Sequence, residues 1–222
     1  MDWQALWLSL RLAFWTVALL LPLSIFLGRR LAYGAFRGKG LVEALVTLPL
    51  VLPPTVLGFY LLVAFSAQSP LGALWREMFG QPLAFSFQGL LLASLIVNIP
   101  FAVQPAQRAF EAIAPEVREA AACCGMSPLR RLWSVELPLA WPGVLTAMVL
   151  SFAHTLGEFG VVLMVGGAIP GETKTVAIAI YDRVQAFDGA AAAQMSLALL
   201  AISLGTIAFS FAMSRRVGRR LG

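Results

Sequence analysis

The sequence predicts an all-α protein that crosses a lipid bilayer about five times. Three observations lead to this fold class: the composition, five long apolar segments, and the polar stretches that separate them. Of the 222 residues, 59% are hydrophobic and 12% are charged, whereas a soluble domain carries about 25% charged residues. Much of this surface must therefore face lipid, and we expect a single transmembrane domain over residues 1–222.

The first two apolar segments, about 6–28 and 42–67, are each long enough to cross the hydrocarbon as a helix, which takes about 20 residues. Three prolines interrupt the second segment, namely Pro49, Pro53 and Pro54. A proline removes a backbone donor, and carbonyl groups freed at membrane depth need protein or water beside them. We therefore expect the second helix to be broken and to face a neighbour or a polar pathway.

The loop between these segments, from Gly34 to Gly40, reads GAFRGKG and is superficially similar to a phosphate-binding loop. That motif needs four residues before its Gly-Lys pair and a Ser or Thr after the lysine. Here only three residues precede the pair, and Gly40 follows the lysine. The loop is interpreted as a basic turn, so any ATP and magnesium that this protein uses are expected on another chain.

Three further spans are expected at about 87–110, 141–167 and 190–213. The third span carries Asn98 among prolines and other polar residues, so it should face protein and not lipid. The fourth span is expected to open with Pro142 at the first turn of its helix. The region 168–188 is too charged to cross and is interpreted as extramembrane or re-entrant.

A charged stretch, residues 115–138, separates the third and fourth spans and cannot lie in hydrocarbon. Its signals describe two short helices joined by a turn. Pro115 suits the first position of a helix, Gly125 suits a left-handed C-terminal cap, and Ser127 suits the N-cap of the second helix. Pro138 is expected to stop that second helix.

The same stretch resembles a motif of ABC importer permeases, E-A-A, three residues, G, nine residues and I-x-L-P. The matching residues are Glu119, Ala120, Ala121, Gly125, Val135, Leu137 and Pro138. Every spacing agrees, and valine replaces isoleucine at one position. The resemblance implies that 115–138 is the coupling loop, which docks in a cleft of a cytoplasmic ATPase subunit. The alternative, an ordinary amphipathic loop between helices, would not require so many matching positions.

The residues of the coupling loop indicate how it could dock. Small alanines let a helix approach a partner groove closely, and the arginines could pair with acidic groups at its rim. The predicted docking residues are Arg118, Glu119, Ala120, Ala121, Gly125, Arg130, Arg131, Leu137 and Pro138. Cys123 and Cys124 are interpreted as small apolar packing residues that a cytosolic loop keeps reduced.

The basic residues predict the orientation of the chain. Twelve of the sixteen Lys and Arg residues fall in 29–40, in 108–138 and in the C-terminal tail, which share one side if the number of spans is odd. The positive-inside rule then places the N-terminus outside and the coupling loop and C-terminus in the cytoplasm. We expect a multi-pass protein of a bacterial inner membrane. The net charge of +5 is a topology signal and does not predict nucleic-acid binding.

Ser151, His154, Thr155 and Glu158 share one face of the fourth span, at relative positions 0, 3, 4 and 7. We call these four residues the polar stripe. One interpretation is that the stripe lines a translocation path or its gate. The other is that it makes hydrogen bonds between helices, worth about 1 kcal/mol each. The two interpretations are compatible.

Thr55 and Asn98 join the polar stripe as candidate pathway residues, because they are neutral donors within the spans. Glu158 would repel an anion, so its carboxylate is expected to be paired, with Arg11 as one possible partner. His154 is the only histidine in the sequence, and a metal site is not predicted.

A second resemblance concerns the cargo. The run Gly157-Glu158-Phe159-Gly160, followed by Gly166-Gly167, resembles permeases that import tetrahedral oxyanions. Residues 169–182 and 48–58 look like molybdate permeases in particular. This resemblance covers essentially the whole chain. It implies the type I ABC importer permease fold and an oxyanion cargo, most specifically molybdate, with sulfate and tungstate as alternatives.

We therefore expect a transport subunit and not an enzyme, with no cofactor of its own. The resemblance implies two permease copies, a cytoplasmic ABC ATPase dimer that docks on the coupling loops, and an external oxyanion-binding protein. A passive channel would need no docking loop. An intramembrane hydrolase would need a nucleophile–base pair or a metal set, which the sequence does not offer.

Overall fold

The computed structural model describes residues 1–221, with side chains described as far as Phe209 and at Ala212. The secondary-structure elements of this part of the chain are all helices, joined by loops, and it holds no strand. Four helices are long and apolar enough to cross a membrane, and the number of crossings rises to five if one bent pair of helices counts as a span. The expected all-α membrane fold is confirmed.

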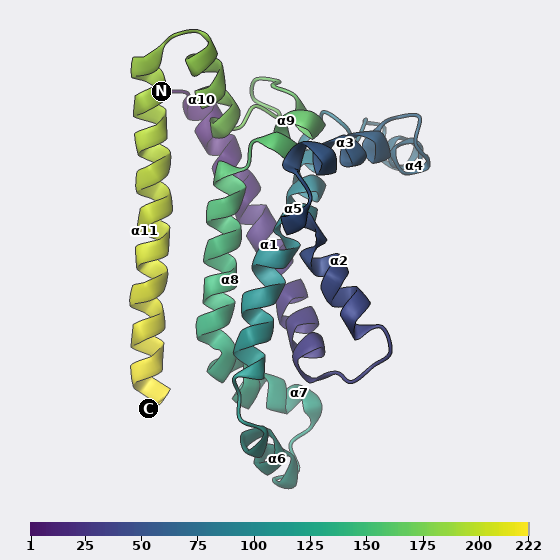
Figure 1. Ribbon diagram of the computed structural model, residues 1–222, viewed down its shortest axis with the longest axis vertical. Coiled ribbons are helices and arrows are strands. Elements are labelled where there is room, and N and C mark those ends of the chain that lie inside the picture. The colour runs from purple at the N-terminus through teal and green to yellow at the C-terminus, as the bar shows by residue number, and fades with distance from the viewer. Residues whose placement is uncertain (222) are drawn as a thin grey trace.

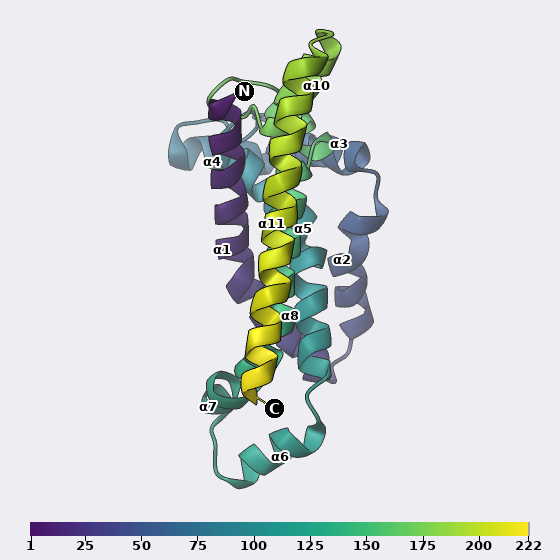
Figure 2. The same ribbon diagram turned by 90° about the vertical axis from the view of Figure 1, so that its left-hand side faces the viewer.

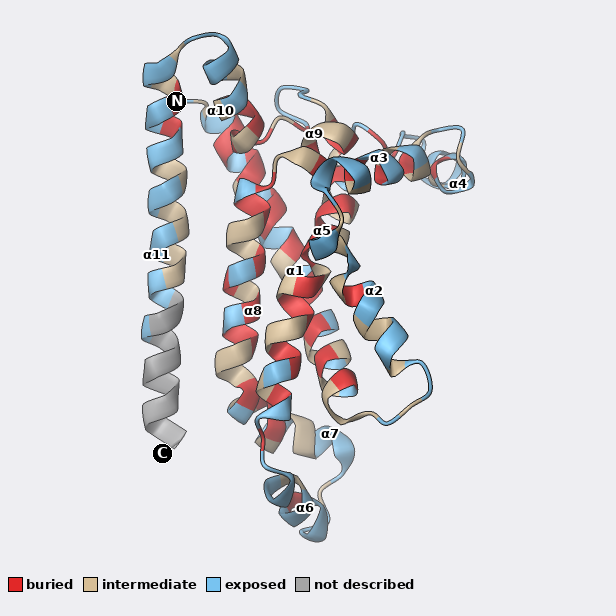
Figure 3. Cartoon of the chain, in the orientation of Figure 1, coloured by how far each residue is buried: buried red, intermediate tan, exposed pale blue. Residues whose placement is uncertain are grey.

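Three helices form the centre of the bundle: α1 (Trp3–Tyr33), α5 (Phe87–Glu111) and α8 (Leu137–Gly157). Helix α5 packs along both of the others, as Figure 1 shows. Helix α8 approaches α5 closely at Gly143, where a built Cβ would collide with Ala109 and would lie 3.0 Å from the Pro105 carbonyl oxygen. Burial is highest here (Figure 3), which fits the polar and proline-rich sequence of α5.

The expected second span is two helices, α2 (Lys39–Val51) and α3 (Pro54–Phe65), bent by 109°. The break falls at Leu52 and Pro53, whose backbones are extended. Pro53 disfavours a helical conformation at the residue before it, and Pro54 then occupies the first position of the next helix. Helix α3 therefore lies across the bundle (Figure 1) and leads to α4 (Pro70–Phe79).

The fourth span differs from its expected bounds of 141–167. A π-turn, η1 (Leu132–Glu136), leads directly into α8. One helix that is long enough to cross a membrane therefore runs from Pro128 to Gly157. The prediction that Pro138 stops the preceding helix is wrong, because the helix that begins at Pro128 continues through η1 into α8, of which Pro138 is the second residue. Pro142 lies inside α8 and does not open it.

The chain leaves the helical conformation after Gly157 and then forms α9 (Gly160–Gly166), α10 (Val176–Gln185) and α11 (Gly189–Leu221). Helix α10 packs on α11 and, through Ser9, on α1. Only 11% of the apolar window of α11 is buried, against 56% for α5. Helix α11 therefore presents most of its length to lipid or to another chain. The basic run at 215–220 falls among side chains that are not described.

The two ends of the bundle carry different elements. The N-terminus, α4 and α10 lie at one end, and the coupling loop lies at the other end together with the C-terminal end of α11 (Figures 1 and 2). An odd number of crossings produces this arrangement.

Candidate functional site

The coupling loop consists of α6 (Pro115–Cys123), α7 (Pro128–Arg131) and η1. Gly125 ends α6 with a φ of +72°. Its N–H donates to the Ala122 carbonyl at 2.9 Å, and the Met126 N–H donates to the Ala121 carbonyl at 3.2 Å. This pair of bonds defines a Schellman cap, which favours glycine at the left-handed position. The predicted cap is therefore confirmed.

The predicted docking residues divide into surface and interior groups. Glu119, Ala120, Gly125 and Arg130 are exposed, whereas Ala121 and Leu137 are buried. Leu137 belongs to an apolar cluster with Phe110 at the C-terminal end of α5, so it anchors the loop to the bundle. The remaining members, Arg118, Arg131 and Pro138, are partly buried.

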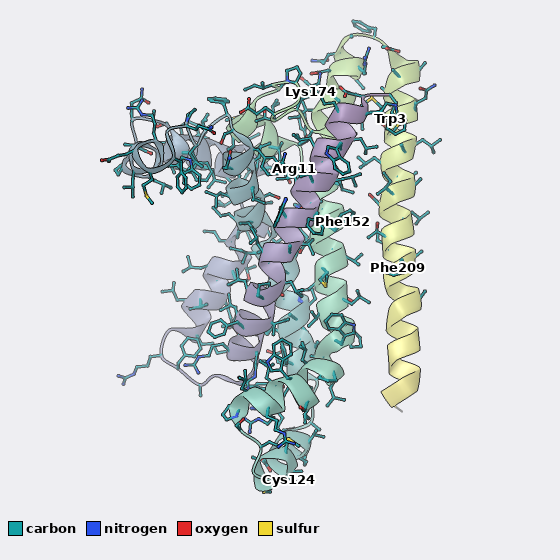
Figure 4. All side chains as sticks on the ribbon, turned by 180° about the vertical axis from the view of Figure 1, so that it is seen from behind. Trp3, Arg11, Cys124, Phe152, Lys174 and Phe209 are labelled. Carbon is teal, nitrogen blue, oxygen red and sulfur yellow. The ribbon has the colours of Figure 1, made fainter. Side chains whose placement is uncertain are left out.

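Cys123 and Cys124 are both exposed, so the expectation that they are packing residues is wrong. Helix α6 touches the rest of the chain along one narrow face only, with Ala121 as its buried residue. Cys124 lies at the tip of the loop, far from the bundle (Figure 4).

Sequence reasoning missed Glu136, the position that the I-x-L-P motif leaves free. Its carboxylate is fully buried and accepts hydrogen bonds from three guanidinium groups. Arg29 of α1 bonds both oxygens, Arg131 Nε lies 3.1 Å from Oε1, and Arg118 Nε lies 3.4 Å from the same oxygen. We call these four residues the Glu136 cluster. The sequence offered one signal for this cluster, because Glu136 is an acidic residue that lies close to arginines at the motif.

The Glu136 cluster continues into the ends of two helices. The Arg118 guanidinium lies over the Tyr33 ring, 3.4 Å from its centroid. The Tyr33 hydroxyl donates to the Phe110 carbonyl oxygen at 2.8 Å. Through these contacts α6 is tied to the last turn of α1 and to the end of α5. In this conformation Glu136 binds the side chains of both Arg118 and Arg131, and their contact with a partner stays a prediction.

Within the bundle, a chain of polar side chains joins α1, α5 and α8. His154 Nδ1 lies 3.2 Å from Asn98 Oδ1, and Asn98 Nδ2 donates to the Ser94 carbonyl oxygen at 2.8 Å. The Ser94 hydroxyl accepts a 3.0 Å hydrogen bond from Thr16 of α1. The His154 ring also stacks on Phe101, with 4.1 Å between centroids. The interpretation of the polar stripe as hydrogen-bonding residues between helices thus holds for His154.

Glu158 lies where α8 ends, and its extended backbone turns the carboxylate toward the start of α9. Its Oε1 accepts a 3.0 Å hydrogen bond from the Val161 N–H, and Oε2 lies 3.7 Å from His154 Nε2. The suggested pairing with Arg11 is wrong, because the Arg11 guanidinium stacks on the Phe87 ring, 4.3 Å from its centroid. Figure 4 shows Arg11 on the N-terminal half of α1.

The other candidate pathway residues do not gather at one point. Thr155 donates to the Ser151 carbonyl within α8, and both side chains are buried. The Ser151 hydroxyl has no hydrogen-bond partner in the described part of the chain. Thr55 is exposed on α3. The structure therefore brings Asn98, His154 and Glu158 together and leaves Thr55 apart.

Two cavities open along the bent α2–α3 segment. One, of about 130 Å³, lies between the Pro49–Pro54 break and the side chains of Phe101, His154 and Glu158. The other, of about 420 Å³, lies between α2 and the C-terminal half of α5 and is lined mainly by polar and charged side chains. In it, Gln107 donates to both Glu43 and Glu111, and Gln104 donates to Thr47.

The bend at Pro53 thus exposes polar groups of α5 and α8 along one side of the bundle. Among the described residues no cluster of His, Cys, Asp or Glu could hold a metal ion. The arrangement brings together neutral donors, two cavities and, at one end of the bundle, a charged loop.

These features define a class of membrane transport subunit, and comparison with known proteins shows the family. The family described as "Binding-protein-dependent transport system inner membrane component" matches residues 20–221. The chain belongs to this family of ABC importer permeases. A multi-pass location in an inner membrane follows from the family and from the apolar helices.

Among curated proteins the chain is similar to molybdenum transport permeases. It is 45% identical to the molybdenum transport system permease protein ModB of Azotobacter vinelandii, over 97% of this chain and 95% of that protein. It is 34% identical to ModB of Escherichia coli K12, over 100% and 97% of the two chains. A sulfate transport permease, CysT of E. coli K12, is 33% identical over 84% of this chain and 67% of that protein.

Solved structures share the fold at low sequence identity. A bacterial alginate ABC transporter in complex with its pentasaccharide-bound periplasmic protein matches with a TM-score of 0.76 and 16% identity, over 96% of this chain and 78% of that chain. The inward-facing MetNI methionine ABC transporter matches with a TM-score of 0.72 and 18% identity, over 97% and 94%. The expected importer permease fold is confirmed by both.

Proposed function

We propose that this chain is the permease subunit of an ATP-driven importer that carries molybdate into the cytoplasm. The observation that carries the proposal is the 45% identity, over nearly the full length of both chains, to a molybdenum transport permease. The fold agrees with that activity, because it joins a proline-broken bundle to a charged loop of the importer motif.

In the proposed complex, two copies of this chain form the pathway at their interface. Two ATPase subunits bind the coupling loops, with Glu119, Ala120 and Arg130 as exposed contacts and Gly125 as the cap that shapes the surface. ATP and magnesium belong to those subunits. An external binding protein delivers the anion. The weakly buried α11 offers a long apolar face for the second copy or for lipid.

The proposed orientation places the N-terminus outside and the coupling loop in the cytoplasm. It rests on the positive-inside rule applied to the basic residues near the coupling loop and in the turn before α2. Closure of the ATPase dimer would then move the coupling loops and shift the bundle between outward and inward arrangements.

The proposed path runs beside the bent α2–α3 segment, past Asn98 and His154, with Ser151, Thr155 and Thr55 as further candidate donors. No arginine faces the cavity of about 130 Å³ at this depth. Neutral donors hold an anion weakly enough to release it, whereas a strongly basic site would trap it. Glu158 serves as the cap of α9 in this proposal and does not contact the anion.

Sulfate is the second candidate cargo, because a sulfate permease is 33% identical to this chain. The test is uptake into proteoliposomes that contain the permease, its ATPase and its binding protein, with molybdate, tungstate and sulfate in competition. We expect molybdate to drive uptake and to stimulate ATP hydrolysis. Uptake of sulfate alone would refute the molybdate assignment. Failure of every oxyanion to stimulate hydrolysis would refute the oxyanion assignment as well.

A further inference from the structure

The Glu136 cluster connects the coupling loop to α1, which the backbone does not link directly at this end of the bundle. The coupling loop is continuous with α8 through η1, so a displacement of the loop reaches α8 directly. Helix α1 is distant in the sequence, with Arg29 107 positions before Glu136, and it meets the loop here through side chains. Its charged connection is the Arg29 guanidinium, which bonds both oxygens of Glu136.

The arrangement of charges makes the connection between Glu136 and Arg29 sensitive to the loss of either partner. One buried carboxylate faces three guanidinium groups, one each from α1, α6 and α7. Charge-assisted bonds between arginine and carboxylate are directional, and truncating one partner of a buried pair leaves the other without compensation. Without Glu136 the three guanidinium groups would repel one another, so its carboxylate is what keeps them close together.

We propose that Glu136 is the positioning residue that transmits movement of the coupling loop to α1, with Arg29 as its receiving partner. The inference rests on the proposed function, because the movement comes from an ATPase docked on the loop. While the Glu136–Arg29 bond holds, α1 and α8 follow the loop together, and α5 packs against both. Without the bond, only the stacking of Arg118 on Tyr33 and apolar packing connect the loop to α1, so α1 follows the loop less closely and the bundle switches incompletely.

Arg118 and Arg131 have a supporting role. They fix the Glu136 carboxylate to α6 and α7, and Arg118 also stacks on Tyr33 at the end of α1. Removal of Glu136 therefore disturbs the whole loop, whereas removal of the Arg29 side chain breaks only the charged connection to α1 and leaves the Arg118–Tyr33 contact in place. Arg29→Gln is the cleaner test for that reason.

The experiment uses the full complex in proteoliposomes and measures oxyanion uptake and ATP hydrolysis in the same sample. The variants are Arg29→Gln, which removes the charge, and Arg29→Lys, which retains it. Arg30→Gln is the matched control, because Arg30 is adjacent, exposed and stacked on Phe36. A purely structural defect would lower hydrolysis and uptake in proportion. A transmission defect lowers the uptake obtained per ATP.

We expect Arg29→Gln to keep stimulated hydrolysis and to lose about tenfold in uptake per ATP, within the range of roughly 5–150-fold typical of coupling between sites. Arg29→Lys should retain most of the coupling, and Arg30→Gln should match the wild type. An unchanged ratio in Arg29→Gln, or a parallel fall of both activities, would overturn this inference alone. A wild-type complex without oxyanion-stimulated hydrolysis would overturn the proposed function, and this inference with it.

Discussion

Gly125 provides the sharpest test of how the coupling loop is shaped. Its φ is +72°, and a Cβ built there would meet nothing within 4 Å. A side chain at this position therefore costs only the left-handed backbone, about 1–2 kcal/mol for an ordinary L-residue. Asparagine adopts this conformation far more readily than a β-branched residue does. We expect Gly125→Val to loosen the cap of α6 and Gly125→Asn to preserve it.

The loss should appear as weaker ATPase binding, because the cap sets the surface that the partner recognises. A penalty of about 1–2 kcal/mol corresponds to about 5–30-fold in affinity. The assay is titration of the ATPase onto the permease in lipid nanodiscs. Gly40→Val is the matched control, because Gly40 also faces open space but lies in α2 without a positive φ. Equal affinities for Gly125→Val and Gly125→Asn would refute the reasoning.

Substitutions at three further residues, Gly143, Asn98 and Glu158, test the bundle. In Gly143→Val the new side chain collides with Ala109 and forces α5 from α8, which should cost about 1–3 kcal/mol of stability and lower the Tm in detergent. The control Gly205→Val places its side chain in open space and should leave the Tm unchanged. Asn98→Ala should cost only about 1 kcal/mol of stability but should lower oxyanion uptake; normal uptake would exclude Asn98 from the path. Glu158→Gln retains an acceptor for the Val161 N–H at the start of α9, so this variant should still take up the oxyanion. Glu158→Ala removes the acceptor and should not. Equal uptake by the two variants would contradict the capping role of Glu158.

The features predicted correctly from sequence are those with local causes. Gly125 caps α6 because the left-handed position follows from its own neighbours along the chain. The break in the second span follows from Pro53 and Pro54, each of which restricts the residue beside it. The importer motif also has local spacing, and the family comparison confirms the class that it indicates.

The features that were missed depend on residues far apart in the sequence. Glu136 and Arg29 are separated by 107 positions, and no periodicity within one helix could pair them. Arg11 was assigned to Glu158 because both are charged residues of apolar helices, but the turn after Gly157 points the carboxylate to α9 instead. Pro138 did not end its helix, because the helix that begins at Pro128 continues through the π-turn η1 into α8.

The position of the coupling loop can be tested with the native cysteines, the only two in the sequence, since Cys123 and Cys124 are exposed on α6. The measurement is their reaction with a membrane-impermeant maleimide in right-side-out and inverted vesicles, with and without the ATPase. We predict labelling in inverted vesicles alone and protection when the ATPase is bound. Labelling from the outer face, or equal labelling with the ATPase present, would contradict the docking of this loop on a cytoplasmic motor.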